Sequence, residues 1–317
     1  MDTIDLKGNR LLIDQLTVAG VPIPALAGTV WYVDAKTGSD SRDGDTWDTA
    51  LSTMAEVFTR LKSGDTILFR GKVKEQVTTP AGVFDVTIIG AANRPRHPDN
   101  HTESNGLRGS SSAGWLSPDS ATASTPLLKI QQQGWKVVNV LFGAGPASTA
   151  SVLVFRDGGA GDAERDASHA YFLGCRWSAP VIAIQDSGGC FNVRIEDCKI
   201  HGATTAAINN VTGAGIGTLL HWEILRNQIL DNAIGIDLSS DQAVIQGNVI
   251  GKHTTYGIDL NGGSYNMVNG NWLQGDYTTD TGQYRAGSND NWAGNFSMDE
   301  DEGTVTSGVT HAVPTTD

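Results

Sequence analysis

Residues 245–250 read IQGNVI, and variants of this phrase recur along the second half of the chain. The related stretches are IEDCKI at 195–200, ILRNQI at 224–229 and VNGNWL at 268–273. A column of Cys or Asn runs through the phrases and extends in both directions, and its members are Cys175, Cys198, Asn227, Asn248, Asn271 and Asn295. A phrase that returns at intervals of 21 to 29 residues is the signature of stacked structural repeats.

A second column runs in phase with the first, and its members are Ile184, Ile208, Ile236 and Ile258. Each repeat holds short runs in which apolar residues alternate, separated by Gly, Asn, Asp or Thr. No segment between the columns has apolar residues at helical spacing, and the leucine-dense consensus of leucine-rich repeats is absent. The pattern therefore predicts a coil of short parallel strands in which equivalent residues of successive turns stack on one another.

Across about residues 65–297, these repeats resemble the right-handed parallel β-helix of the pectate-lyase-like superfamily. The resemblance implies an all-β fold, a single-stranded right-handed parallel β-helix solenoid. In such a stack each Asn of the column can bond to the backbone and amide of the next turn, which explains the column without any function. Because this scaffold hosts lyases, hydrolases, adhesins and virus spikes, it implies a fold but not an activity.

The residues before the repeats predict a cap, because the open end of a solenoid must be covered against edge pairing. Residues 31–34 have the composition of a strand, 37–44 form a turn cluster, and 49–61 place apolar residues at the spacing of an amphipathic helix. We therefore expect a cap of one strand and an N-terminal capping helix over residues 31–70. Residues 1–30 are too short to fold alone, and we expect an N-terminal docking arm for another chain.

The β-helix is expected over residues 71–297, with insertions near 91–126 and 156–170. Long loops in a solenoid are usually functional or form subunit contacts, and we expect 91–126 at a subunit interface. Residues 298–317 form an acidic C-terminal tail, which is either a final strand or a disordered extension. A docking arm followed by a β-helix resembles bacteriophage tailspikes and other virion spikes, and we expect a homotrimer.

The chain has a formal net charge of -13 at pH 7, from 35 Asp and Glu against 22 Lys and Arg. This charge argues against nucleic acid as a partner, because phosphate contacts need clustered Lys and Arg. It also disfavours anionic membranes, and no apolar run is long enough for membrane insertion. The three cysteines, Cys175, Cys190 and Cys198, are few and odd in number, which favours buried thiols over a disulfide framework.

Two carboxylates of the second column are candidates for catalysis. Asp237 and Asp259 occupy equivalent positions one turn apart, in line with Gln185 and Asn209. Since each follows a buried Ile, alternation predicts that these side chains point outward, with about 5 Å between neighbouring strands. Two carboxylates at that separation could act as acid and nucleophile of a retaining glycosidase, could share a cation, or could be exposed and inactive.

A second candidate is a binding site on the loop 156–170, whose acidic and imidazole side chains are Asp157, Asp162, Glu164, Asp166 and His169. They could bind a ligand or hold Ca²⁺, which takes several oxygen ligands from flexible turns, although the spacing matches no EF-hand loop. The two arginines of the loop favour a third interpretation, an Arg–Asp network that fixes its shape.

Tryptophans are candidates for stacking on sugar rings. Trp115, in the first insertion, is assigned to the binding site, whereas Trp272 and Trp292 lie in repeat columns and are expected to be packing residues. The sequence contains no pattern of a Ser-His-Asp triad, a Cys/His zinc site or a phosphate loop. We therefore expect no cofactor and no assigned metal, apart from the Ca²⁺ considered above.

These features predict a bacteriophage virion structural protein: a spike, fibre or capsid decoration whose β-helix rod contacts the host surface or a glycan. Its partners would be other virion proteins, bound through residues 1–30, and bacterial surface polysaccharide. It would be assembled in the host cytoplasm and exposed outside the cell on the virion. The alternative is a polysaccharide depolymerase, a glycoside hydrolase or lyase, so the sequence leaves open whether the protein is an enzyme.

Overall fold

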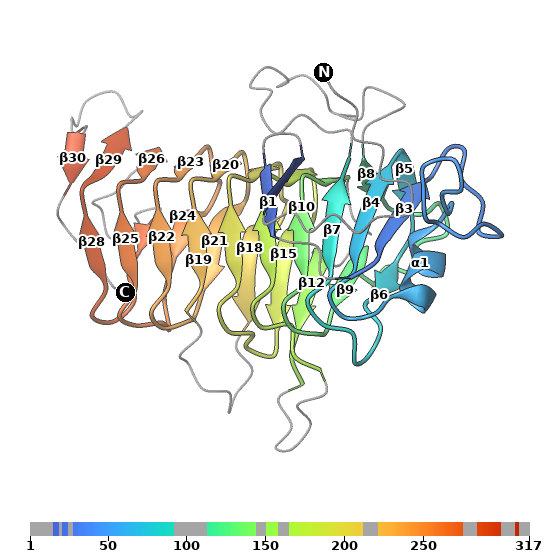
Figure 1. The fold of residues 1–317 in the computed structure, drawn as a ribbon. Coiled ribbons are helices and arrows are strands. Elements are labelled where there is room, and N and C mark those ends of the chain that lie inside the picture. Colours follow the sequence, from blue (N-terminus) through green and yellow to red (C-terminus); the bar gives the residue numbers. More distant parts are fainter. Residues whose placement is uncertain are drawn as a thin grey trace.

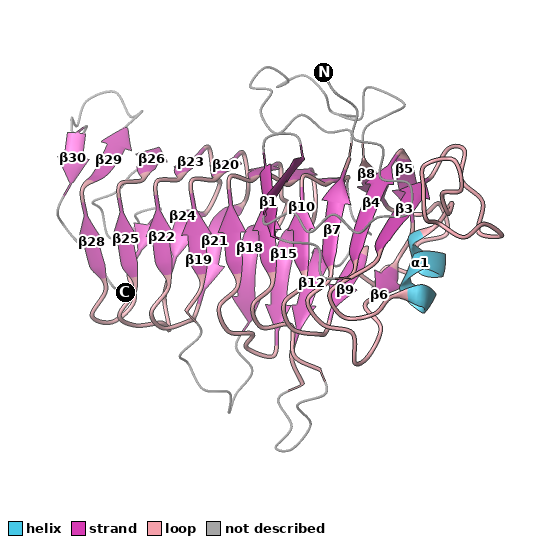
Figure 2. Cartoon of the chain, in the orientation of Figure 1, coloured by secondary structure: helices cyan, strands magenta, loops and turns pink. Residues whose placement is uncertain are grey.

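The computed structural model describes residues 28–91, 113–143, 150–157, 165–211, 221–274 and 284–298, and three short strand segments at 15–18, 21–24 and 308–310. Strands and short turns make up most of these residues (Figure 2). They stack along one axis into a rod, with the helix α1 (Met54–Arg60) at one end (Figure 1).

Three sheets run along the rod, and from β4 to β27 each turn of the chain contributes one strand to each of them. Sheet 1 consists of β3 (Val30–Asp34), β4 (Thr66–Arg70), β7 (Thr87–Gly90), β10 (Lys136–Val138), β13 (Tyr171–Leu173), β16 (Arg194–Glu196), β19 (Glu223–Leu225), β22 (Val244–Gln246), β25 (Met267–Asn269) and β28 (Asn291–Ala293). Sheet 2 consists of β5 (Lys72–Lys74), β8 (Gly114–Leu116), β11 (Leu141–Phe142), β14 (Arg176–Ser178), β17 (Lys199–His201), β20 (Gln228–Leu230), β23 (Val249–Gly251), β26 (Trp272–Gln274), β29 (Asn295–Met298) and β30 (Gly308–Thr310). Sheet 3 consists of β6 (Val77–Thr78), β9 (Leu128–Ile130), β12 (Ala150–Phe155), β15 (Ile182–Ser187), β18 (Ala206–Val211), β21 (Ile234–Leu238), β24 (Tyr256–Asp259) and β27 (Tyr284–Arg285).

The strand register confirms the fold expected from the repeats. Ile195 pairs in parallel with Ile224, and Ile224 with Ile245, so the recurring phrases lie directly over one another. The second column is also in register, since Ile208 pairs with Ile236. Three parallel sheets wound by one chain make the molecule an all-β, right-handed parallel β-helix.

The core is a set of stacked side chains along the axis of the rod. The central residue of each short strand points inward, and Ile195, Ile224 and Ile245 are fully buried. Near the α1 end the stack is aromatic, because the Phe142 ring lies parallel to those of Trp115 and Trp177, with centroids 6.0 and 5.1 Å away. Burial of such side chains stabilises each turn only when its neighbours are present, which makes the stack cooperative.

The asparagine column forms the predicted ladder inside the turn between sheets 1 and 2. The Asn248 side chain accepts from the backbone N–H of Asn227 at 2.8 Å and donates to the Asn271 amide oxygen at 2.9 Å. Asn271 repeats the same contact with Asn295 at 2.9 Å. At the other end of the ladder, the backbone N–H of Cys198 donates to Asn227 at 2.8 Å. Every rung thus satisfies a backbone group that the sharp turn would otherwise leave unpaired.

The helix at the end of the rod is shorter than the apolar pattern predicts. It spans Met54–Arg60, not residues 49–61, because Thr53 is in an extended conformation and its side chain caps Glu56 N–H. Leu51, which fits the helical pattern, instead forms a parallel bridge with Val33. Leu51 therefore belongs to the edge of sheet 1 and not to the helix.

The structure also revises the first insertion and the chain ends. The stretch 91–126 was expected to interrupt the repeats, yet its residues 114–116 form β8, because the Trp115 side chain fits the aromatic stack. Residues 92–112 lie outside the described part of the chain. In the arm, β1 (Gln15–Val18) and β2 (Val21–Pro24) form an antiparallel hairpin. In the tail, β30 pairs antiparallel with β29, which supports a final strand.

The three cysteines are buried free thiols, as expected. The Cys175 side chain contacts the carbonyl oxygen of Val137 at 3.3 Å, and that of Cys198 contacts the carbonyl oxygen of Glu196 at 3.2 Å. Burial raises the pKa of Cys190 and Cys198 well above the usual thiol value, so neither is a reactive thiolate. Within the described residues, no helix has the length and apolar character of a membrane span.

Candidate functional site

The Asp237–Asp259 pair lies on the outward face of sheet 3, where the register stacks Asn209, Asp237, Asp259 and Arg285 in one column. The buried Ile neighbours of these residues point into the rod, so alternation turns the polar side chains outward. The Asn209 amide donates to Asp237 Oδ2 at 2.7 Å. The column is therefore a continuous polar chain along the rod.

Asp259 is not the exposed carboxylate that the sequence pattern suggests. Its residue is 6% exposed, and the Arg285 guanidinium donates to both of its oxygens, with Nε 3.1 Å from Oδ1. The backbone N–H of Asn261 donates to the same Oδ1 at 3.0 Å. The Arg285 guanidinium also lies over the Tyr256 ring, 4.2 Å from its centroid. Outward direction alone did not imply exposure, because the next turn supplied an arginine that covers the carboxylate.

Asp237 has different surroundings from Asp259. Burial is the largest cause that raises its pKa above the usual carboxyl value, and the neighbouring Asp259 adds to it. The hydrogen bond from Asn209 and the charge of Arg285 act in the opposite direction. A carboxyl with a raised pKa beside an ion-paired carboxylate has the asymmetry of an acid and its partner. However, an Asp259 whose two oxygens are engaged by Arg285 is a poor nucleophile in this geometry.

The loop candidates fall into two groups. Asp162 and Glu164 lie outside the described residues, while Asp157, Asp166 and His169 lie inside them. Asp166, at the described C-terminal end of the loop, accepts from the Ser168 backbone N–H at 2.8 Å and from the Gln133 amide at 3.0 Å.

The Arg156 guanidinium also lies 3.7 Å from Asp166, and the two residues form an antiparallel bridge. Arg156 and Asp166 thus join the two described ends of the loop, and residues 158–164 of the predicted network lie outside the described part of the chain. His169 is exposed, next to Ser168 in the turn. In the described part of the chain, no three His, Cys, Asp or Glu residues come together as metal ligands.

The assignment of Trp115 to a sugar-binding surface is wrong. Trp115 is fully buried, its indole N–H donates to the Glu75 carbonyl at 3.0 Å, and its ring is part of the core stack. It lies at the centre of β8, and the central position of a three-residue strand in sheet 2 faces inward.

The opposite error concerns Trp272. It was expected to pack inside, like Trp292, which is 1% exposed, but Trp272 is 52% exposed. It is the first residue of β26, so its side chain faces outward when that of Leu273 packs inward. Its ring centroid lies 5.0 Å from that of Phe296 on the next turn. Val249, its partner on the preceding turn, is 42% exposed, and the three form an outward apolar column.

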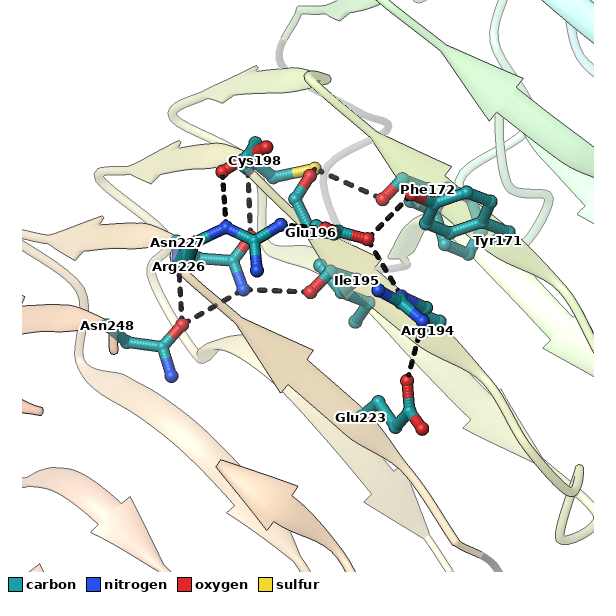
Figure 3. Close-up of polar contacts among 11 residues, drawn as sticks. Tyr171, Phe172, Arg194, Ile195, Glu196, Cys198, Glu223, Arg226, Asn227 and Asn248 are labelled. Atoms are coloured by element: carbon teal, nitrogen blue, oxygen red, sulfur yellow. Dashed lines mark hydrogen bonds and ion pairs between the residues drawn. The ribbon is translucent and has the colours of Figure 1, made fainter. Parts of the chain in front are cut away.

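Sequence reasoning also missed a charged cluster on sheet 1, centred on Glu196 (Figure 3). Glu196 is 7% exposed; it accepts from the Tyr171 hydroxyl at 2.6 Å and from Arg194 Nε at 2.7 Å, and a guanidinium nitrogen of Arg226 donates to its other oxygen. Arg194 also contacts Glu223 at 3.1 Å. The in-register positions of Tyr171, Arg194 and Glu223 could have indicated this cluster. With every charge paired, it is a structural clamp across three turns.

Comparisons with known proteins identify the fold of the chain. No protein-family model matches the chain, and no curated protein matches it. Among solved structures, the chain is similar to pectate lyase Pel9A, with a TM-score of 0.53 and 10% identity over 91% of this chain and 77% of that one.

Two further solved structures match with lower scores. A lacto-N-biosidase of GH136 from Eubacterium ramulus has a TM-score of 0.47 and 12% identity over 86% of this chain and 56% of that one. The Dettilon tailspike protein has a TM-score of 0.45 and 13% identity over 85% of this chain and 55% of that one. The chain thus spans little more than half the length of these two proteins. The sheet topology and the likeness to Pel9A identify the chain as a right-handed parallel β-helix with the pectate-lyase-like fold.

Proposed function

We propose that this chain is a glycan-binding β-helix rod of a bacteriophage virion, as a spike, fibre or capsid decoration. The observation that carries the proposal is the exposed Trp272 ring, which packs beside Phe296 on the outward face of sheet 2. Parallel pairing on both sides fixes the backbone of β26, so the indole is held open to solvent on a rigid support. Aromatic rings presented in this way suit the apolar face of a sugar ring.

Binding is favoured over cleavage by the state of the outward carboxylates. A retaining hydrolase needs one carboxylate free to attack the sugar. Asp259 is buried, and Arg285 donates to both of its oxygens. In the described part of sheet 3, no carboxylate other than that of Asp259 stands on a strand next to Asp237. Attack by Asp259 would first require the loss of that ion pair.

The virion role rests on the arrangement at the N-terminus. At the start of the continuously described part of the chain, the Thr29 backbone N–H and the Trp31 indole donate to the Asp65 carboxylate at 2.7 and 2.9 Å. Residues 1–28 precede these contacts, so they can dock on another virion protein without unpairing sheet 1. We place the rod outside the cell in contact with bacterial surface polysaccharide, as a homotrimer with the part of the first insertion that precedes β8 between subunits.

A polysaccharide depolymerase is the second candidate, and Asp237 is the observation that favours it. Its raised pKa and its position next to Asp259 suit a general acid. In this alternative Asp237 would protonate the leaving oxygen of a glycan bound along sheet 3, and Arg285 would hold Asp259 in place.

The experiment combines binding and cleavage. The protein is incubated with purified capsular polysaccharides and lipopolysaccharides; binding is measured by biolayer interferometry, and cleavage by new reducing ends or unsaturated products. We expect binding without cleavage, and a loss of about tenfold in affinity for Trp272→Ala but not for Trp272→Phe.

Each alternative outcome has a distinct meaning. A parent protein that binds no glycan and no host cell refutes the binding function. Cleavage by the parent that Asp237→Asn abolishes establishes the depolymerase instead.

A further inference from the structure

Sheet 2 differs from the rest of this acidic chain in its charge. The chain contains 35 Asp and Glu, but the described strands of sheet 2 contain none. Sheet 1 carries acidic residues in β3, β16 and β19, and sheet 3 carries them in β15, β21 and β24. The ionisable side chains in the strands of sheet 2 are all basic, namely Lys72, Lys74, Arg176, Lys199 and His201.

The outward side chains of sheet 2 form an ordered series along the rod. The register aligns one outward residue from each successive strand, in the order Arg176, Lys199, Gln228, Val249, Trp272 and Phe296. Neighbours in this series lie about 4.8 Å apart along the rod, the spacing of parallel strands. Along the rod axis, the series therefore begins with two cations, continues with an amide and ends with one aliphatic and two aromatic side chains.

The two cations of the series are adjacent and have the same sign. On sheet 1 Arg194 pairs with Glu196 and Glu223 (Figure 3), and Arg226, in the turn after β19, pairs with Glu196 and Asp197. On sheet 3 Arg285 pairs with Asp259. Among the described residues, no carboxylate forms an ion pair with Arg176 or Lys199.

Partial burial lowers the pKa of both Arg176 and Lys199, and the charge of Arg176 lowers that of Lys199 further. Like charges stacked on neighbouring strands destabilise a sheet unless a counter-charge is supplied. A bound anion would supply the counter-charge that Arg176 and Lys199 lack.

The geometry points to the outward face of sheet 2 as a binding track for an anionic polysaccharide that lies along the rod. Its acidic groups would contact Arg176 and Lys199, a hydroxyl would bond with Gln228, and the apolar face of a sugar would stack on Trp272 and Phe296. This assignment rests on the proposed glycan-binding function and specifies its ligand as acidic.

Other occupants fit the face less well. A second copy of this chain in the same direction would place cation against cation, and one in the opposite direction would place the cations against the apolar side chains. Three apolar side chains also bury far less area than the roughly 800 Å² per partner of a stable interface. A nucleic acid would need a longer basic stripe than two adjacent cations.

The test uses variants of sheet 2 with matched controls elsewhere. Arg176→Gln and Lys199→Gln each remove one half-buried cation, and Lys136→Gln removes a half-buried lysine from sheet 1. Trp272→Ala is compared with Tyr265→Ala, which removes a ring that is 63% exposed but lies outside the three sheets. Unchanged circular dichroism and melting temperature establish that each variant is folded.

Each variant is tested on an array of acidic and neutral bacterial polysaccharides. The parent should prefer acidic glycans, and Arg176→Gln, Lys199→Gln and Trp272→Ala should each weaken binding about tenfold. The Lys136 and Tyr265 variants should bind as the parent does. Added salt should weaken binding of the parent more than that of the double variant R176Q/K199Q, because it screens the charges.

Chemical changes to the glycan identify the anion. Reduction of the carboxyl groups of a bound glycan to alcohols should abolish the preference if uronic acids are recognised, and removal of phosphate should do so if phosphate is recognised. Preference for neutral glycans, or equal binding by the parent and the double variant, overturns the track while leaving glycan binding intact. Absence of binding to any glycan overturns the proposed function together with the track.

Discussion

Replacement of Asn248 by alanine tests whether the asparagine ladder holds the turns together. Asn248 is fully buried, and its side chain makes four hydrogen bonds. It donates to the carbonyl of Ile224 at 2.8 Å and to the Asn271 amide oxygen at 2.9 Å. It accepts from the backbone N–H of Asn227 at 2.8 Å and from the Asn227 amide at 3.0 Å.

The cost follows from the groups that lose a partner. In Asn248→Ala the Asn227 amide keeps its bond to the carbonyl of Ile195, and Asn271 still accepts from the backbone of residue 248. The Asn227 backbone N–H loses the side-chain oxygen to which it donates, and the Ile224 carbonyl loses one donor. An unsatisfied buried polar group costs about 1 to 3 kcal/mol. We therefore expect the free energy of unfolding to fall by about 3 kcal/mol.

Urea unfolding followed by circular dichroism measures this loss. Asn248→Asp separates hydrogen bonding from volume, because an aspartate accepts as Asn248 does but faces the Ile224 carbonyl and the Asn271 oxygen without a donor. It should destabilise at least as much as alanine. Asn291→Ala, at an exposed position of β28, should change stability by less than about 0.5 kcal/mol. If Asn248→Ala costs no more than Asn291→Ala, the ladder does not stabilise the stack.

Three further predictions concern pH, the arm and assembly. Burial raises the pKa of Asp186 from 3.8 to about 7, so the stability that its proton supplies is fully present below pH 3.8 and is lost as the pH rises through 7. The free energy of unfolding should fall by about 4 kcal/mol over that range, and Asp186→Asn should flatten that part of the profile. Deletion of residues 1–28 should leave the melting temperature unchanged and abolish incorporation into particles; a chain that no longer folds would place the arm in the cap. Light scattering should give the mass of a trimer. A parent protein that is a monomer, and remains a monomer when residues 92–112 are deleted, would contradict this prediction.

The repeats predicted the fold because a parallel stack makes distant residues equivalent. Once Asn227, Asn248 and Asn271 were aligned, the register of the strands around them followed. The same logic failed at Trp115, whose strand stands apart from the regular repeats, so no neighbouring phrase marked it as part of a column. Sequence reasoning also predicted a helix that is too long, since apolar spacing does not reveal that Thr53 is the N-cap and that the helix begins at Met54.

The candidate site was predicted only in part for a related reason. The alignment placed Asp237 and Asp259 on adjacent strands, as the structure has them. It did not reveal Arg285, because β27 follows the stretch 275–283, which breaks the repeat. Alternation gives the direction of a side chain, but its exposure depends on what the next turn places over it.

The sheet 2 series, which includes Trp272, shows that the net charge of the whole chain does not describe the charge of each face. The net charge of -13 argues against an anionic partner when it is spread evenly over the molecule. A β-helix does not have to spread it evenly, because each position of the repeat falls on the same sheet. Here the described strands of sheets 1 and 3 carry charges of both signs, whereas those of sheet 2 carry no carboxylate. At physiological ionic strength charges act over about 8 Å. A polymer lying on sheet 2 would therefore interact with Arg176 and Lys199, and far less with carboxylates on the opposite faces of the rod.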